Sequence, residues 1–121
     1  ARERAAAAGV GDRVKFELVD YRALDGRFDR IVSIGMFEHV GAAHYDEFFA
    51  QCRRLLANDG VMLLHTIGKY GKAGKPDPFT DKYIFPGYHL PSLEQMSAAA
   101  ARARLIVSDV ETLRLHYAFT L

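Results

Sequence analysis

The chain has 121 residues, of which 50% are hydrophobic and 26% are charged, and its formal net charge is +1. These values are typical of one globular domain or part of one, and they give no argument for nucleic-acid binding, which needs a clustered basic face. The single cysteine, Cys52, excludes an internal disulfide and fits a reducing compartment, and no apolar run approaches the ~20 residues of a membrane span.

The N-terminal third of the chain predicts one helix and two strands. Residues 2–8 are strong helix formers, and Gly9 is a natural stop. Residues 13–19 alternate between apolar and charged side chains, which predicts a half-buried strand. After a loop or short turn, residues 28–36 are more continuously apolar and therefore predict a strand in the centre of a sheet.

The clearest helix is predicted for residues 43–56. Its apolar side chains recur at helical spacing, with polar and charged side chains between them, and Gly60 follows where the helix should end. Residues 61–67 begin with an unbroken apolar run, which predicts a third strand. A strand, helix and strand joined by short links imply parallel pairing with a right-handed crossover.

The rest of the chain predicts a long loop, a helix and a strand. Residues 68–79 are rich in glycine and proline and predict a loop, and the aromatic segment 81–92 predicts a packed loop. A helix over residues 92–104 begins with a Ser-x-x-Gln capping box, and residues 105–113 predict a fourth strand. The alternation of helix and strand predicts an α/β fold, with a mostly parallel sheet and flanking helices.

Polar and aromatic residues follow each predicted strand. In open parallel sheets, ligands bind beyond the carboxyl ends of the strands, and those ends meet on one face. We therefore expect Glu38 to lie where its strand leaves the core and meets a cleft. The residues that converge there include Asp20, Tyr21 and Arg22; Gly35 and Glu38; His65 and Ile67; and Tyr117.

Each of these residues also has an ordinary structural explanation. Glu38 can be the acid at a helix N-terminus, and Asp20 can be a turn residue. His65 can be a satisfied core histidine, Tyr117 a packing residue, and Ile34 part of the core. From spacing alone these explanations stay open beside the functional ones.

Other site chemistries find little support in the sequence. His39 and His44 are not at the spacing of a one-face zinc pair, and Glu38 does not stand in an HExxH frame, so we predict no metal site. No G-x-S-x-G, P-loop or G-x-G-x-x-G occurs, and Cys52 falls on the apolar face of its predicted helix. Serine-hydrolase, cysteine-hydrolase and simple nucleotide-loop chemistry are therefore not indicated.

Several stretches, taken together and in order, resemble a known family from Arg13 onward. They are DRVKFELVDYR, FDRIVSIGMFEHVG, YDEFFAQCRRLLANDGVMLLHTIG, KYIFPGYHLPSLEQM and DVETLRLHYAFTL. The same order is found in the cyclopropane-fatty-acyl-phospholipid synthases, which are S-adenosylmethionine-dependent methyltransferases. The combination of GMFEHVG, LLHTIG and KYIFP is much more specific than any one of these motifs.

The resemblance implies a reaction and a base site. The reaction is methyl transfer from S-adenosylmethionine to a cis double bond of a phospholipid acyl chain, which yields a cyclopropane ring. In the family, the base is a bound bicarbonate ion. Carried over residue by residue, its holders here are Glu38, His65, Tyr117 and the backbone amide of Ile67. Glu38 fits beside this anion if bicarbonate keeps its proton and donates it in a hydrogen bond to the carboxylate.

The resemblance also implies a cofactor site. Asp20, Tyr21 and Arg22 match the segment that lies along the adenine, where an aromatic ring can stack and a carboxylate can accept from the amine. Ile34 and Gly35 match the wall beside the cofactor. The family's glycine-rich loop would precede Ala1. We therefore expect residues 1–121 to be an incomplete methyltransferase domain that has a partial Rossmann-like fold and lacks the first strands.

Further expectations concern partners and location. The expected substrate is a phospholipid acyl chain, and the expected location is cytoplasmic. Peripheral contact with the inner face of the membrane is one interpretation of the Lys-rich and aromatic loop at residues 69–85, and an ordinary solvated loop is the alternative. A homodimer is one option for assembly, and no nucleic-acid partner is expected. The alternatives are another small-molecule methyltransferase on this scaffold, or a non-catalytic fragment.

Overall fold

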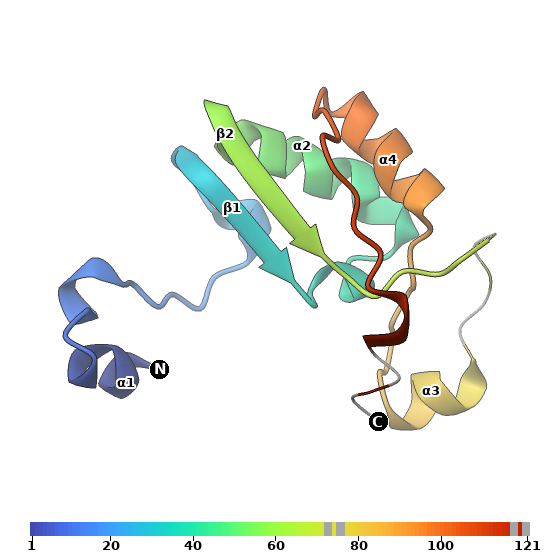
Figure 1. Cartoon of the computed structure of the whole chain (residues 1–121), viewed down its shortest axis with the longest axis horizontal. Coiled ribbons are helices and arrows are strands. Elements are labelled where there is room, and N and C mark those ends of the chain that lie inside the picture. Colours follow the sequence, from blue (N-terminus) through green and yellow to red (C-terminus); the bar gives the residue numbers. More distant parts are fainter. Residues whose placement is uncertain (72–73, 75–76, 117–118, 120–121) are drawn as a thin grey trace.

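The structure, a computed structural model, describes residues 1–71, 74, 77–116 and 119. Its centre is a pair of parallel strands, β1 (Phe28–Ile34) and β2 (Leu56–His65), connected through helix α2 (Tyr45–Leu55) (Figure 1). The α/β class and the parallel pairing predicted from the sequence are thus confirmed.

The register of the two strands contains one irregularity. Phe28 pairs with Leu56, but Arg30 already pairs with Val61, so residues 57–60 form an extra loop of β2 opposite a single residue of β1. The predicted role of Gly60 as the end of the preceding helix is therefore wrong. The helix ends at Leu55, because Leu56 already has extended backbone angles.

The core lies on one face of the sheet, where α2 packs against helix α4 (Leu93–Arg102) (Figure 1). The helical spacing of apolar residues in α2 turns them all toward this core, as the sequence predicted. Met62 and Leu64 of β2 contribute to it from the sheet. The buried members of the cluster are Phe37, Tyr45, Phe48, Phe49, Cys52, Ala99 and Ala100.

Two polar features place α4. The side chain of Ser92 accepts a hydrogen bond from the Gln95 backbone amide, and the Gln95 side chain accepts one from the Ser92 amide, so the predicted capping box is confirmed. At the other end of the helix, Arg102 forms a 2.6 Å ion pair with Asp46 in the first turn of α2. The capping box defines where α4 begins, and the ion pair joins its last turn to the first turn of α2.

The opposite face of the sheet is open to solvent. Val32, Ile34, Val61 and Leu63 alternate with the inward-facing residues of their strands and are each 57–67% exposed. Alternation in a strand places neighbouring side chains on opposite faces. The central, doubly covered strand that was predicted for residues 28–36 is therefore covered on one face only.

Two predicted strands are wrong. Residues 14–20 and 105–113 have no regular secondary structure, and among the described residues the only sheet is the pair of β1 and β2. Leu18 and Ile106 are almost fully exposed. A strand is held by hydrogen bonds to a neighbouring strand, and no described segment provides one at these positions.

The helices outside the core are short. Helix α1 (Arg2–Ala7) ends before Gly9 as predicted and lies away from the sheet, beyond an extended segment (Figure 1). Helix α3 (Pro78–Tyr83) falls partly in each of two predicted loops and was missed, although Asp77 caps it and Pro78 opens it. Single 3₁₀ turns occur at Gly11–Arg13, Tyr21–Ala23, Phe37–His39, Ala42–His44 and Arg114–His116. No helix in the described ranges is long and apolar enough to cross a bilayer.

Candidate functional site

The carboxyl ends of β1 and β2 lie side by side. Ile34 pairs with His65, and the backbone amide of Gly35 donates a 3.1 Å hydrogen bond to the His65 carbonyl. Gly35 has a φ of +64°, a conformation that favours glycine, and a Cβ placed there would meet no atom within 4 Å. The predicted convergence of Gly35 and His65 is therefore observed, with free space beside the turn.

Glu38 lies in the 3₁₀ turn Phe37–His39 that follows β1. The Phe37 side chain is fully buried between the rings of the α2 aromatics, and this holds the turn against the core. Glu38 is consequently only 6% exposed, although it is an acid. Buried carboxylates need hydrogen-bond partners.

One oxygen of Glu38 is bound by the end of β2. The backbone amide of Ile67 donates a 2.7 Å hydrogen bond to Oε1 of Glu38. The backbone carbonyl of Glu38 in turn accepts from the amide of His89 at 2.7 Å. Two segments distant in sequence thus meet at Glu38, and the predicted grouping of Glu38 with Ile67 is observed.

The other oxygen of Glu38, Oε2, is closed off from solvent and has no partner among the described residues. Nearby, the Tyr45 hydroxyl is also buried. Desolvation raises the pKa of Tyr45 to about 12, and the negative charge of Glu38 is the second cause. Glu38 therefore lies in a desolvated environment on the side of the core, with the Tyr45 hydroxyl as a polar neighbour.

The remaining predicted members of the base site are less enclosed. His65 is exposed and ends β2 on the open face of the sheet, so it is not the buried core histidine of the structural alternative. Tyr117 lies outside the described residues. The described chain before it ends in the 3₁₀ turn Arg114–His116.

The segment predicted to lie along the adenine forms a 3₁₀ turn, Tyr21–Ala23, with Asp20 as its cap. Arg22 binds both carboxylate oxygens of Asp20, at 2.6–3.2 Å, and this hydrogen bonding lowers the pKa of Asp20 to about 2. The Tyr21 ring contacts Phe48 edge-on at 5.5 Å, and Gln51 of α2 donates to the Tyr21 carbonyl. The turn is therefore docked on α2.

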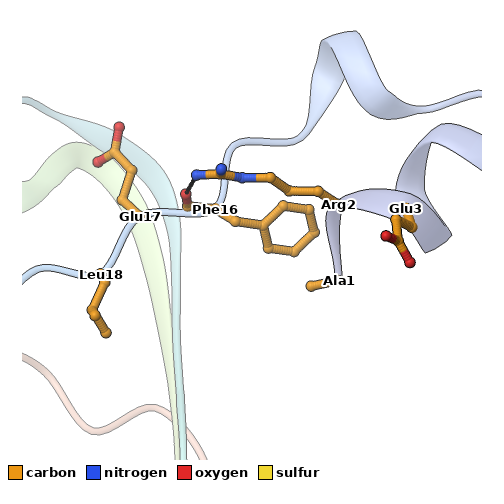
Figure 2. Close-up of a pocket in the computed structure, with 6 residues that line it drawn as sticks. All are labelled: Ala1, Arg2, Glu3, Phe16, Glu17 and Leu18. Atoms are coloured by element: carbon orange, nitrogen blue, oxygen red, sulfur yellow. Dashed lines mark hydrogen bonds between the residues drawn. The ribbon is translucent and has the colours of Figure 1, made fainter.

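Sequence reasoning missed Tyr45 and His89 as neighbours of Glu38. The periodicity of α2 did indicate that Tyr45 faces the core, but nothing local to residue 89 indicates contact with residue 38. Figure 2 shows a concave region elsewhere, lined by residues 1–3 and 16–18, where the Arg2 guanidinium donates to the Phe16 carbonyl at 3.1 Å. None of the predicted site residues lines it.

Comparison with known sequences finds one matching family model and several related proteins. The sequence profile described as mycolic acid cyclopropane synthetase matches residues 1–121. A "Probable fatty acid methyltransferase" of Pseudomonas putida is 44% identical over 128 aligned positions, covering 99% of this chain and 32% of that protein. The "Cyclopropane-fatty-acyl-phospholipid synthase" of Escherichia coli K12 is 45% identical over 104 positions, covering 86% of this chain and 27% of that protein. The chain thus spans about a third of the length of these relatives.

Solved structures show the same relationship. The mycolic acid cyclopropane synthase CmaA1 in complex with SAH and CTAB superposes with a TM-score of 0.74 at 37% identity, covering 86% of this chain and 41% of that one. The cyclopropane synthase MmaA2 from Mycobacterium tuberculosis gives a TM-score of 0.78 at 30% identity, covering 98% and 48%.

Proposed function

The chain belongs to the mycolic acid cyclopropane synthetase family, and from this premise we propose that it is part of an S-adenosylmethionine-dependent methyltransferase that builds cyclopropane rings in lipids. The proposed substrate is a cis double bond in a phospholipid acyl chain. Since the chain spans 27–32% of its curated relatives, the proposed domain is larger than the segment described here.

The observation that carries this proposal is the buried carboxylate of Glu38 at the ends of two parallel strands. The double bond of the acyl chain attacks the sulfonium methyl group, which leaves a carbocation on the lipid. Ring closure then needs a base that removes a proton from the new methyl group without quenching the cation. A carboxylate held away from solvent is suited to support such a base without admitting water.

Bicarbonate fits the donors and acceptors of this site and would supply the base. Oε1 of Glu38 already accepts from the Ile67 amide, and a carboxylate oxygen has a second lone pair for the hydroxyl of the ion. The resemblance implied that the Ile67 amide holds the ion directly, but this amide donates to Glu38, so we propose that it supports the ion through that carboxylate. The imidazole of His65 and the phenol of Tyr117 are the further donors that we propose.

The cofactor would lie on the other side of the β1 end. The open space beside Gly35 allows a ligand to approach the backbone, and the exposed Ile34 side chain offers an apolar wall. Asp20 stays ionised beside Arg22 and is exposed, so we propose that its carboxylate accepts from the adenine amine in exchange for part of its bonding to Arg22. Tyr21, held by α2, is the proposed stacking ring.

The decisive experiment is Glu38→Gln in the full-length protein, with labelled S-adenosylmethionine and mass detection of one added methylene in extracted lipids. We expect loss of ring formation while S-adenosylmethionine still binds. Glu111→Gln, which changes an exposed glutamate, is the matched control and should keep full activity. Undiminished product from Glu38→Gln would reject the base-site assignment.

A lipid substrate also requires access to a membrane, and we propose that α3 and the residues after it provide it at the inner face. Phe79, Tyr83, Ile84 and Phe85 are 42–63% exposed, and Lys82 lies among them. Exposed aromatics beside cations suit an anionic lipid surface. Lys69 contacts residues 91–92 and not α3 in any described contact, and Lys72 and Lys75 lie outside the described residues. Homodimer formation remains a separate prediction.

Vesicle sedimentation of the full-length protein tests the membrane contact. Phosphatidylglycerol vesicles should bind the protein more than phosphatidylcholine vesicles do, and added salt should weaken this binding. Phe79→Ser with Phe85→Ser should reduce it, whereas Leu18→Ser, at a fully exposed site outside α3 and the residues after it, should not. Binding that ignores both anionic lipid and salt would contradict the proposal.

A further inference from the structure

Glu38 and two residues packed beside its turn each bury a polar side-chain atom without a partner. The atoms are Oε2 of Glu38, the hydroxyl of Tyr45 and Nε2 of His89, and each is closed off from solvent without a hydrogen-bond partner among the described residues. Such groups in native proteins are nearly always hydrogen-bonded, to an ordered water where no protein group is available. Three of them in neighbouring residues call for an explanation.

Independent contacts show that these side chains are neighbours. The Tyr45 ring stacks on the ring of Phe37, the residue before Glu38, at a centroid distance of 4.5 Å. The rings of Tyr45 and His89 are 6.1 Å apart, and the His89 backbone amide donates to the Glu38 carbonyl at 2.7 Å. The negative charge of Glu38 also contributes, after desolvation, to the raised pKa of Tyr45.

The chemistry of the three atoms is complementary. The phenol donates, the carboxylate accepts, and a neutral imidazole nitrogen does either, depending on its tautomer. No direct hydrogen bond joins them in the structure. One water with three partners would satisfy all three at once, and buried waters typically make about three hydrogen bonds.

We propose that Tyr45 and His89 are positioning residues for Glu38, which they hold through one shared buried water on Oε2. The water would hold the Glu38 carboxylate on the side of the core. Oε1 would then stay beside the Ile67 amide and face the proposed bicarbonate. The effect on catalysis rests on the proposed function, whereas the presence of the water does not.

The structural test is a high-resolution crystal structure of the full-length protein. We expect one ordered water within hydrogen-bonding distance of Glu38, Tyr45 and His89, and its loss in Tyr45→Phe. A direct contact between the three side chains, or another protein group on Oε2, would overturn the inference whatever the activity of the protein.

The kinetic test separates positioning from packing. Tyr45→Phe and His89→Leu should each lower kcat about tenfold, the low end for residues that orient a site group, while leaving S-adenosylmethionine affinity and lipid KM unchanged. His89→Gln, which can still bond to the water, should recover most of kcat, and Tyr70→Phe, at a fully exposed tyrosine, should have no effect. Full kcat in Tyr45→Phe and His89→Leu, with Glu38→Gln inactive, would reject this inference alone; an active Glu38→Gln would reject the proposed function.

Discussion

The backbone amide of Ile67 donates a 2.7 Å hydrogen bond to Oε1 of Glu38. This contact joins the segment after β2 to the 3₁₀ turn after β1, so it closes the two strand ends around one buried acid. A carboxylate fixed in this way does not need to reorient when substrate arrives, and such preorganisation is the main source of electrostatic catalysis.

Glu38→Ala should lower the free energy of unfolding by about 1–3 kcal/mol, because it leaves the buried Ile67 amide without its acceptor. Glu38→Gln keeps an acceptor oxygen and should cost less. Chemical denaturation of both variants, with Glu111→Ala as the exposed control, measures the difference. Equal stability of Glu38→Ala and the parent would show that the hydrogen bond contributes nothing.

The free energy of unfolding should fall as the pH rises from about 10 to about 12. Burial raises the pKa of Tyr45 to about 12 in the folded state, against about 10 in an unfolded chain. The folded state therefore holds the proton more tightly, and this stabilisation is complete below pH 10 and lost through pH 12. Denaturation at several pH values should show a shallower decline in Tyr45→Phe, and Tyr70→Phe should behave as the parent.

Cys52 should react slowly with thiol reagents in the native protein. The side chain is buried in the cluster around α2, and this burial raises the pKa of its thiol to about 11. The thiolate is the reactive form, so both access and ionisation oppose reaction. Modification followed at pH 8 should be complete only after denaturant is added, and rapid labelling without denaturant would mean that the core around α2 opens readily.

Ser92→Ala should destabilise the protein by about 1 kcal/mol, the usual effect of losing a helix N-cap. The substitution removes the acceptor for the Gln95 amide and breaks the capping box of α4. Ser97→Ala within the same helix is the matched control and should have little effect, because alanine is a good residue in a helix interior. Thermal unfolding of both variants compares them directly.

Local patterns were sufficient where the stabilising contacts are themselves local. The apolar spacing in α2, the Ser-x-x-Gln cap of α4 and the apolar run of β1 depend on residues a few positions apart. Each element is confirmed, although β1 is covered on one face only and is not the central strand that was predicted. Helix α3 was missed although its Asp-Pro start carries a capping signal. That signal was outweighed by the glycine and proline content of the same stretch.

The strand predictions show the opposite case. Residues 13–19 alternate as well as any strand, yet they pair with no other strand in the described part of the chain. Alternation specifies which side chains would face a core, but the ladder of hydrogen bonds requires a second segment in register. Periodicity within one segment carries no information about that partner.

By itself, then, the amino-acid sequence determined the α/β class, the parallel crossover, the helix faces and the family to which the chain belongs. Only the tertiary structure decided that the acid after β1 is buried, that its Oε1 is bound by the amide after β2, and that Tyr45 and His89 pack beside the turn that carries it. The reason is physical: helix periodicity and capping arise from interactions within one turn or two, whereas the burial of a carboxylate depends on which distant segments pack around it.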